Sequence, residues 1–111
     1  MYEYAEKLLD FIAASPSRYH VCANLKSRLI SAGYTPLPEQ AVWDVRPGGR
    51  YVVMRNDSSL LAFRVPEGGA AGFMLAAAHS DSPTFQIKEH AEKVSARCTV
   101  LDTEKYGGML M

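Results

Sequence analysis

The chain has 111 residues, 48% of them hydrophobic, and twelve basic residues balance twelve acidic ones. This length and composition support one modest core and exclude a disordered chain. The zero net charge gives no electrostatic reason to expect nucleic acid or an anionic membrane as a partner. The longest apolar run is too short to span a bilayer, and the mixed, acidic N-terminus is unlike a signal peptide, so we expect a cytoplasmic protein.

Two helices are predicted in the first third of the chain. Residues 2–14 carry apolar side chains at helical spacing, namely Tyr4, Leu8, Phe11 and Ile12. Pro16 ends this helix, because the residue before a proline is disfavoured in the α region. The second helix turns Val21, Cys22, Leu25 and Leu29 inward, and Gly33 stands where a left-handed residue closes a helix. We expect both helices to cover one face of a sheet.

Three strands are predicted in the middle of the chain. Residues 51–55 and 60–65 form the first two, joined by a polar hairpin turn at residues 56–58. Residues 72–78 are all apolar or small and form the third, buried on both faces. An extended connector and a turn precede these strands, at residues 35–38 and 46–49. Helices followed by a meander of strands indicate a mixed α/β fold.

Beyond Pro83 the pattern changes to alternation of apolar and polar residues, typical of a sheet with one wet face. The alternating apolar residues are Phe85, Ile87, Val94, Ala96, Cys98 and Val100. Cys22 and Cys98 have no Cys-x-x-Cys partner, so a thiolate zinc site is not indicated. Both are interpreted as buried thiols, and a disulfide between them stays an open alternative.

The candidate site lies where the predicted third strand ends, at His79 and Asp81. In an extended chain these side chains project to the same side, because side chains alternate with period two. A metal-binding histidine needs such a carboxylate to fix its ring and raise its basicity. A hydrogen-bonded histidine with no ligand role is the alternative, and the short motif alone does not decide between them.

The wider sequence resembles the aspartyl aminopeptidase / aminopeptidase I family of zinc peptidases. Residues 78–83 (AHSDSP), with residues 85–88 (FQIK), are similar to a signature of that family. Three further segments match in the same order: SPSRYH at 15–20 with AGY at 32–34, RNDSSLLAF at 55–63, and EKYGG at 104–108. The family usually has Gly at the position of Asp57 and commonly Thr at that of Ser80.

The resemblance implies a zinc aminopeptidase that releases N-terminal residues, Asp or Glu, from peptide substrates. It implies two zinc ions in the complete active site, although cobalt or manganese also suit such ligands. His79 is then a metal ligand, and Asp81 the carboxylate that orients its imidazole. Residues 1–83 are expected to form the N-terminal part of the catalytic domain, and residues 84–111 the opening strands of an inserted oligomerisation domain. A homo-oligomer follows from the resemblance.

Family members are several times longer than 111 residues, so the chain is expected to be an N-terminal piece that is inactive by itself. Glu89 and His90 match no family motif and are interpreted as a solvated pair. His20 is expected to cap or pack against its helix. Two alternatives stay open: a non-catalytic domain that binds a partner or self-associates through exposed strand edges, and a generic α/β domain.

Overall fold

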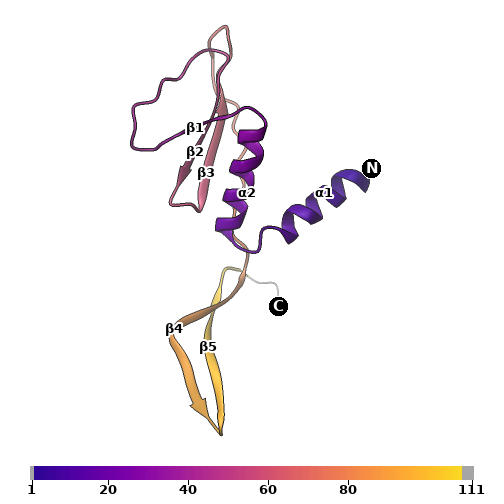
Figure 1. Ribbon diagram of the computed structural model, residues 1–111, viewed down its shortest axis with the longest axis vertical. Helices are drawn as coiled ribbons and strands as arrows, with labels where there is room; N and C mark the ends of the chain where they lie inside the picture. Colours follow the sequence, from indigo (N-terminus) through magenta and orange to yellow (C-terminus); the bar gives the residue numbers. More distant parts are fainter. Residues whose placement is uncertain (1, 109–111) are drawn as a thin grey trace. The chain divides into compact units, whose positions relative to one another are not determined.

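The computed structural model describes residues 2–108, which divide along the chain into two compact units, the first ending at Ser80 and the second beginning at Asp81. The first unit contains α1 (Tyr2–Ala13), α2 (Arg18–Ser31), β1 (Thr35–Leu37), β2 (Arg50–Arg55) and β3 (Ser59–Arg64), and the second β4 (Thr84–Ser95) and β5 (Cys98–Tyr106) (Figure 1). The predicted α/β class is confirmed. Among the described residues, no helix is long and apolar enough to cross a membrane.

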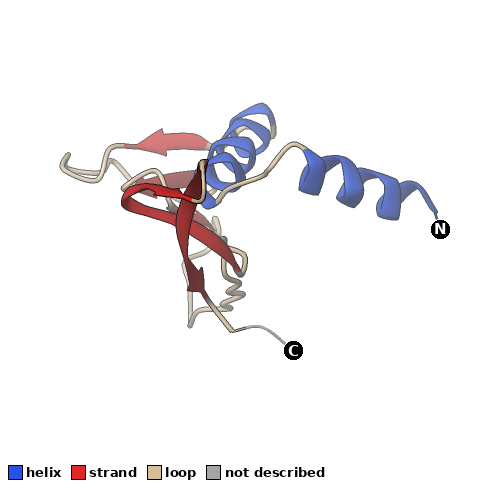
Figure 2. Cartoon of the chain, turned by 90° about the horizontal axis from the view of Figure 1, so that it is seen from below, coloured by secondary structure: helices blue, strands red, loops and turns tan. Residues whose placement is uncertain are grey.

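Strand β2 is the centre of the sheet in the first unit. It pairs in parallel with β1 and antiparallel with β3. Residues 51–53 are all buried, without the alternation of a strand that has one wet face. The reason is that β2 is covered on both faces. Helix α2 packs against β2 and β3, and its Cys22 is, with Val52, among the most deeply buried side chains (Figure 2).

The other face of β2 is covered by aromatic side chains from the β1–β2 connection and from β3. Phe63 lies directly opposite Tyr51 in the β2–β3 register, and the centroids of their rings are 5.3 Å apart. The centroid of the Phe63 ring is also 6.3 Å from that of the Trp43 ring. The Trp43 indole donates to the carbonyl of Pro38 at 2.8 Å, and the Arg46 amide donates to the Tyr51 hydroxyl at 2.8 Å. These bonds hold the connection against the sheet.

Helix α2 ends in the cap that its sequence predicts. Gly33 has a φ of 85°, and its amide donates to the carbonyl of Ile30. The amide of Tyr34 donates to the carbonyl of Leu29, which completes the paired bonds of a Schellman motif. The chain then enters β1 directly.

Helix α1 forms as predicted but does not cover the sheet. It has no buried residue, and Leu8, Leu9 and Ile12 are all more than half exposed. Its contacts run to α2: the Arg28 guanidinium lies 4.6 Å from the centre of the Phe11 ring. The predicted cover of one sheet face is therefore provided by α2 alone, because the described sheet has only three strands and α2 already occupies that face.

Both hairpins turn through left-handed residues. Asn56 and Asp57, at φ of 50° and 52°, form the predicted β2–β3 turn. Ala96 and Arg97, at 47° and 67°, join β4 to β5, so Ala96 belongs to a turn and not to a strand. The β4–β5 register shifts between Ile87 and Glu92. Among the described residues of β4 and β5, Ala91 alone is buried. The sequence predicted a sheet with one buried face, whereas the structure has a largely exposed hairpin.

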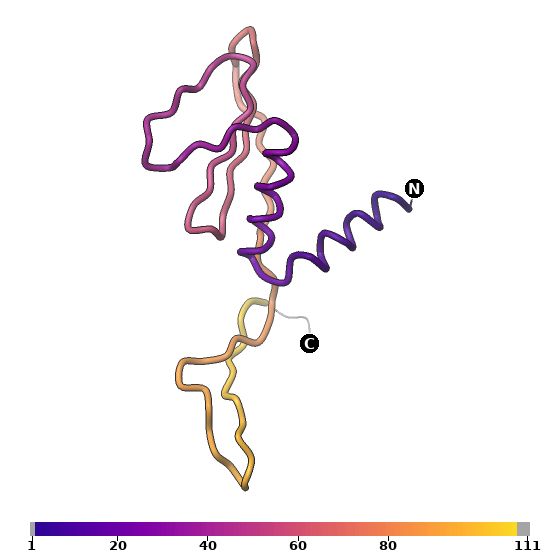
Figure 3. The backbone as a smooth tube through the Cα atoms, viewed as in Figure 1, coloured from indigo at the N-terminus to yellow at the C-terminus, as the bar shows by residue number. Residues whose placement is uncertain are grey.

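Two further predictions are wrong, those for residues 72–78 and for Cys98. Residues 72–78 form no strand, and the side chains of Phe73, Met74 and Leu75 are 99%, 104% and 83% exposed; Figure 3 shows the long connection that leaves β3. An apolar run becomes a buried strand only where neighbours pair with it, and none of the described strands does. Within the extended connector predicted at residues 35–38, Thr35–Leu37 is strand β1, because it pairs with β2. Cys22 is buried as predicted, but Cys98 is exposed, and both thiols are free.

We predict that Gly33→Ala lowers the free energy of unfolding by about 1 kcal/mol, because a side chain at positive φ is strained. Urea denaturation followed by circular dichroism measures the change. Gly68→Ala is the matched control, since a Cβ there would meet open space and its φ is not positive. Equal losses in both variants would show that the cap geometry is not the cause.

Asp102 gives a prediction about pH. The Lys93 ammonium donates to its carboxylate at 2.5 Å and Lys88 lies at 3.5 Å, and these bonds lower the pKa of Asp102 below its ordinary value of 3.8. A lowered pKa stabilises the folded hairpin above that ordinary value, and the contribution is lost as the pH falls through the folded pKa. Lys93→Ala should raise the pKa of Asp102 in a carboxyl NMR titration, more than Lys88→Ala does. Lys105→Ala is the control, and a comparable rise there would point to net charge instead of the Lys93 bond.

Candidate functional site

His79 and Ser80 end the first unit, and Ser80 is attached to the sheet. The Ser80 hydroxyl donates to the backbone carbonyl of Ser58 at 2.9 Å. Ser58 closes the β2–β3 turn, where its amide donates to Arg55. The hairpin therefore holds the chain one residue after His79, whose side chain is exposed. The anchored Ser80 thus fixes the backbone next to His79.

Asp81 begins the second unit and is held from the end of β5. The Tyr106 hydroxyl donates to Asp81 Oδ2 at 2.6 Å, in a half-buried setting. Gly107 follows with a φ of 82°, and a Cβ added to it would lie 3.2 Å from Pro83 Cα. The carboxylate of Asp81 thus has a fixed partner 25 residues further along the chain.

The donor types at this site suit zinc, but the described residues do not complete a zinc site. Imidazole and carboxylate groups are ordinary zinc ligands, and a protein site usually needs three or four of them. Among residues 2–108, no group of three or more His, Cys, Asp or Glu side chains is placed to hold a metal ion.

The remaining candidates have other surroundings. His20 Nδ1 lies 2.8 Å from the hydroxyl of Ser17, the residue that precedes α2, in a contact between two exposed side chains. Ser17 makes no side-chain cap bond to the helix backbone, and the capping or packing role of His20 stays a prediction. Glu89 and His90 are exposed, and His90 has a φ of 55° where the β4–β5 register shifts. Their interpretation as a solvated pair fits this exposure.

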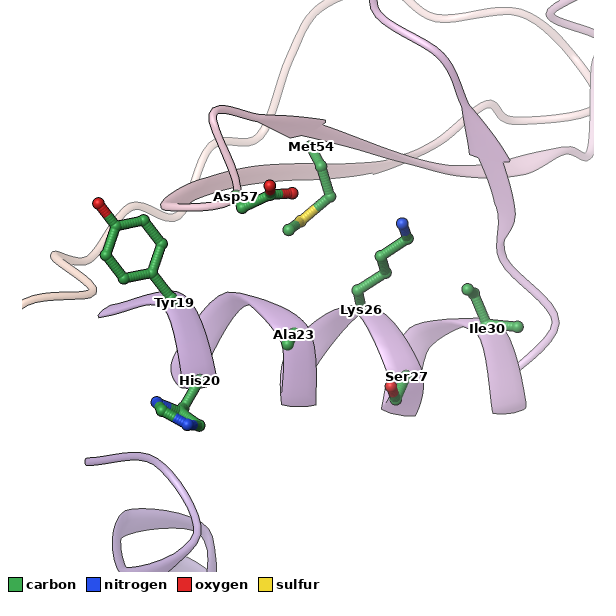
Figure 4. Close-up of a pocket in the computed structure, with 8 residues that line it drawn as sticks. All are labelled: Tyr19, His20, Ala23, Lys26, Ser27, Ile30, Met54 and Asp57. Atoms are coloured by element: carbon green, nitrogen blue, oxygen red, sulfur yellow. The ribbon is translucent and has the colours of Figure 1, made fainter. Parts of the chain in front are cut away.

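A groove of about 560 Å³ lies between α2 and the β2–β3 hairpin. Figure 4 shows Met54 and Asp57 of the hairpin facing Ala23 and Lys26 of the helix. Its lining includes one acidic side chain, Asp57, on the hairpin side and one basic side chain, Lys26, on the helix side. It does not include His79, so it is separate from the candidate metal ligand.

The resolved pKa shifts lie outside the motif. A hydrogen bond from Arg46 lowers the pKa of Asp44, and Lys93 and Lys88 lower that of Asp102. Both carboxylates are on the surface, and these neighbours favour their ionised form. They stabilise local structure and do not report on the chemistry of His79.

Comparison with known proteins identifies the class. A family model described as aminopeptidase I zinc metalloprotease (M18) matches residues 11–111. The probable M18 family aminopeptidase 2 of Clostridium acetobutylicum is 45% identical over 98% of this chain and 26% of that protein. The protein of the same name from Azotobacter vinelandii is 42% identical over 98% of this chain and 26% of its own length.

Solved structures agree with the sequence relatives. A chain in the Ape4 and Nbr1 complex superposes with a TM-score of 0.88 and 38% identity, over 94% of this chain and 21% of that one. Chaetomium thermophilum mApe1 superposes with a TM-score of 0.86 and 33% identity, over 98% of this chain and 26% of that one. A chain of the S. cerevisiae mApe1 dodecamer superposes with a TM-score of 0.81 and 27% identity, over 97% of this chain and 26% of that one. In fold and sequence the chain is similar to one part of the proteins of this class, which the family model describes as zinc metalloproteases. The chain belongs to the aminopeptidase I zinc metalloprotease (M18) family, and it spans about a quarter of the length of the curated relatives it matches.

The resemblance inferred from the sequence is therefore confirmed, whereas the roles of His79 and Asp81 stay predictions. Sequence reasoning missed Tyr106. The segment EKYGG at 104–108 was recognised as a family match, but its tyrosine was given no task. The available signal was a polar aromatic residue placed directly before two glycines at the end of a strand.

We predict that Ser80→Ala lowers the free energy of unfolding by about 1 kcal/mol, because it removes the donor to the Ser58 carbonyl. Ser80→Thr keeps the hydroxyl and should unfold at nearly the same urea concentration as the unmodified chain. If Thr proves as damaging as Ala, the hydroxyl bond is not what holds this position.

Proposed function

We propose that this chain is the N-terminal part of a zinc-dependent aminopeptidase that removes N-terminal residues from peptides. The observation that carries the proposal is the family match over residues 11–111, which includes the His79-Ser80-Asp81 sequence. Peptide hydrolysis of this kind needs a Lewis acid on the carbonyl and an activated water, and zinc supplies both when bound.

In this proposal His79 is one zinc ligand and Asp81 is the carboxylate that orients its imidazole. Support comes from the motif match, from the exposure of His79, and from the bond that anchors Ser80 beside it. The other ligands and the general base would come from parts of the protein outside residues 2–108. A site with two metal ions, with cobalt or manganese as substitutes for zinc, belongs to the same proposal.

The preference for N-terminal Asp or Glu is proposed from the family resemblance alone. An acidic substrate side chain calls for a basic partner in the pocket. No lysine or arginine of this chain is assigned to that task. We propose that the complete protein supplies such a basic side chain at its substrate pocket.

Self-association is proposed as part of the function. The related mApe1 of S. cerevisiae is a dodecamer. Here the β4–β5 hairpin is a two-stranded ribbon with exposed Phe85, Ile87 and Val94, and such edges readily pair with other chains. We propose residues 84–111 as the start of an oligomerisation domain inserted after a catalytic segment at 1–83.

A non-catalytic role for the isolated chain is the second candidate. Phe73, Met74 and Leu75 are almost fully exposed, and exposed apolar surface of this kind marks a contact site. A chain that self-associates through these residues without binding zinc would fit that role.

The first test is zinc binding and peptide cleavage. In the complete protein that contains this chain, His79→Ala should reduce chelator-sensitive release of Asp from a peptide by at least ~100-fold, since it removes a direct ligand. The 111-residue chain alone should release none and should bind Zn²⁺ weakly in calorimetry.

His90→Ala is the matched control, because it removes another exposed histidine outside the motif. Full activity in His79→Ala, or equal losses in both variants, would refute His79 as a ligand. Chelator-sensitive cleavage by the 111-residue chain would refute its dependence on the rest of the protein.

A further inference from the structure

The bond between Tyr106 and Asp81 is an unusual feature of the second unit. It joins the end of β5 to the residue that begins the unit, and its length of 2.6 Å is in the range of hydroxyl–carboxylate bonds, which are stronger than bonds between neutral groups. Asp81 stands two positions after His79 in the sequence. A group that fixes the Asp81 carboxylate therefore acts on a residue of the candidate site.

The hairpin creates this contact. The register places Tyr106 opposite Thr84, so the end of β5 returns to the chain just after Asp81. Gly107 allows the close approach, because its φ is 82° and a Cβ there would lie 3.2 Å from Pro83 Cα. The whole length of β4 and β5 thus separates the two partners in sequence while the pairing brings them together.

We propose that Tyr106 is a positioning residue of the active site, which holds the Asp81 carboxylate in one orientation. The inference rests on the proposed function, in which Asp81 orients the imidazole of His79. The carboxylate of an aspartate rotates about its χ2 torsion with little preference for one angle. A fixed hydrogen-bond donor to Oδ2 therefore selects one orientation of the carboxylate plane. A carboxylate accepts about four hydrogen bonds, so the bond from Tyr106 leaves capacity for an imidazole N–H.

A purely structural role for Tyr106 predicts something different. The hydroxyl bond would then only close the base of the hairpin, and its loss would change stability without changing metal affinity. A positioning residue acts through Asp81 on the metal ligand. Its loss should weaken zinc binding and lower kcat while KM stays the same.

The test uses the complete protein with Tyr106→Phe, which removes the hydroxyl and keeps the ring. Competition with a chromogenic chelator measures the Zn²⁺ dissociation constant, and peptide cleavage gives kcat and KM. We expect the Zn²⁺ dissociation constant to rise by up to ~10-fold, the lower end of the loss that follows removal of a ligand's direct hydrogen-bond partner, because Tyr106 acts one step further from the metal through Asp81. Tyr2→Phe, at an 83% exposed tyrosine, is the matched control and should change neither quantity.

A double-mutant cycle identifies the path of the effect. In an Asp81→Ala background, Tyr106→Phe should cause no further loss of zinc affinity, because the group it positions is gone. Gly107→Ala should give the same direction of change by displacing the end of β5. If His79→Ala and Asp81→Ala leave zinc affinity intact, the proposed function fails. If both weaken it while Tyr106→Phe matches the unmodified protein, or if the cycle is additive, the role of Tyr106 fails and the proposed function stands.

Discussion

The burial of β2 on both faces is the constraint on which the first unit depends. Val52 packs beneath α2, and Tyr51 lies under the aromatic cover formed with Phe63 and Trp43. A three-stranded sheet of short strands has little apolar surface to bury, so both faces of its central strand must contribute. The β2–β3 hairpin is held in place by this packing, and its turn offers the Ser58 carbonyl to Ser80. The exposed His79 is therefore attached, through one neighbour, to the best-packed part of the chain.

The second unit holds Asp81 by a different means. It has almost no core, and the ladder between β4 and β5 gives it its shape. That ladder carries Tyr106 back to Asp81. The position of Ser80 thus depends on the packing of the first unit, whereas that of the Asp81 carboxylate depends on the β4–β5 pairing and on Gly107. The chain belongs to the M18 family and spans about a quarter of the length of the curated relatives it matches.

The errors of sequence reasoning have a common physical origin. Residues 72–78 have the composition of a buried strand, yet a strand exists only with a partner, and the described chain offers it none. Residues 35–37 contain a proline and have no apolar alternation that would indicate a strand, yet they pair with β2 along its edge. The apolar stripe of α1 predicts a helix correctly, but does not say what the stripe packs against. Cys98 looked like a core residue because alternation identifies a face and not its burial.

The sequence by itself determined the local structure and the family. Helical spacing located α1 and α2, Gly33 marked the end of α2, polar residues marked the β2–β3 turn, and four ordered motifs identified the M18 relationship. These are properties of neighbouring residues or of fixed spacing, which a sequence displays directly. Only the tertiary structure decided that Ser80 is bound to Ser58 and that Tyr106 is bound to Asp81. Those contacts join residues 22 and 25 positions apart, and their formation depends on strand register, which is fixed by pairing and packing across the whole unit.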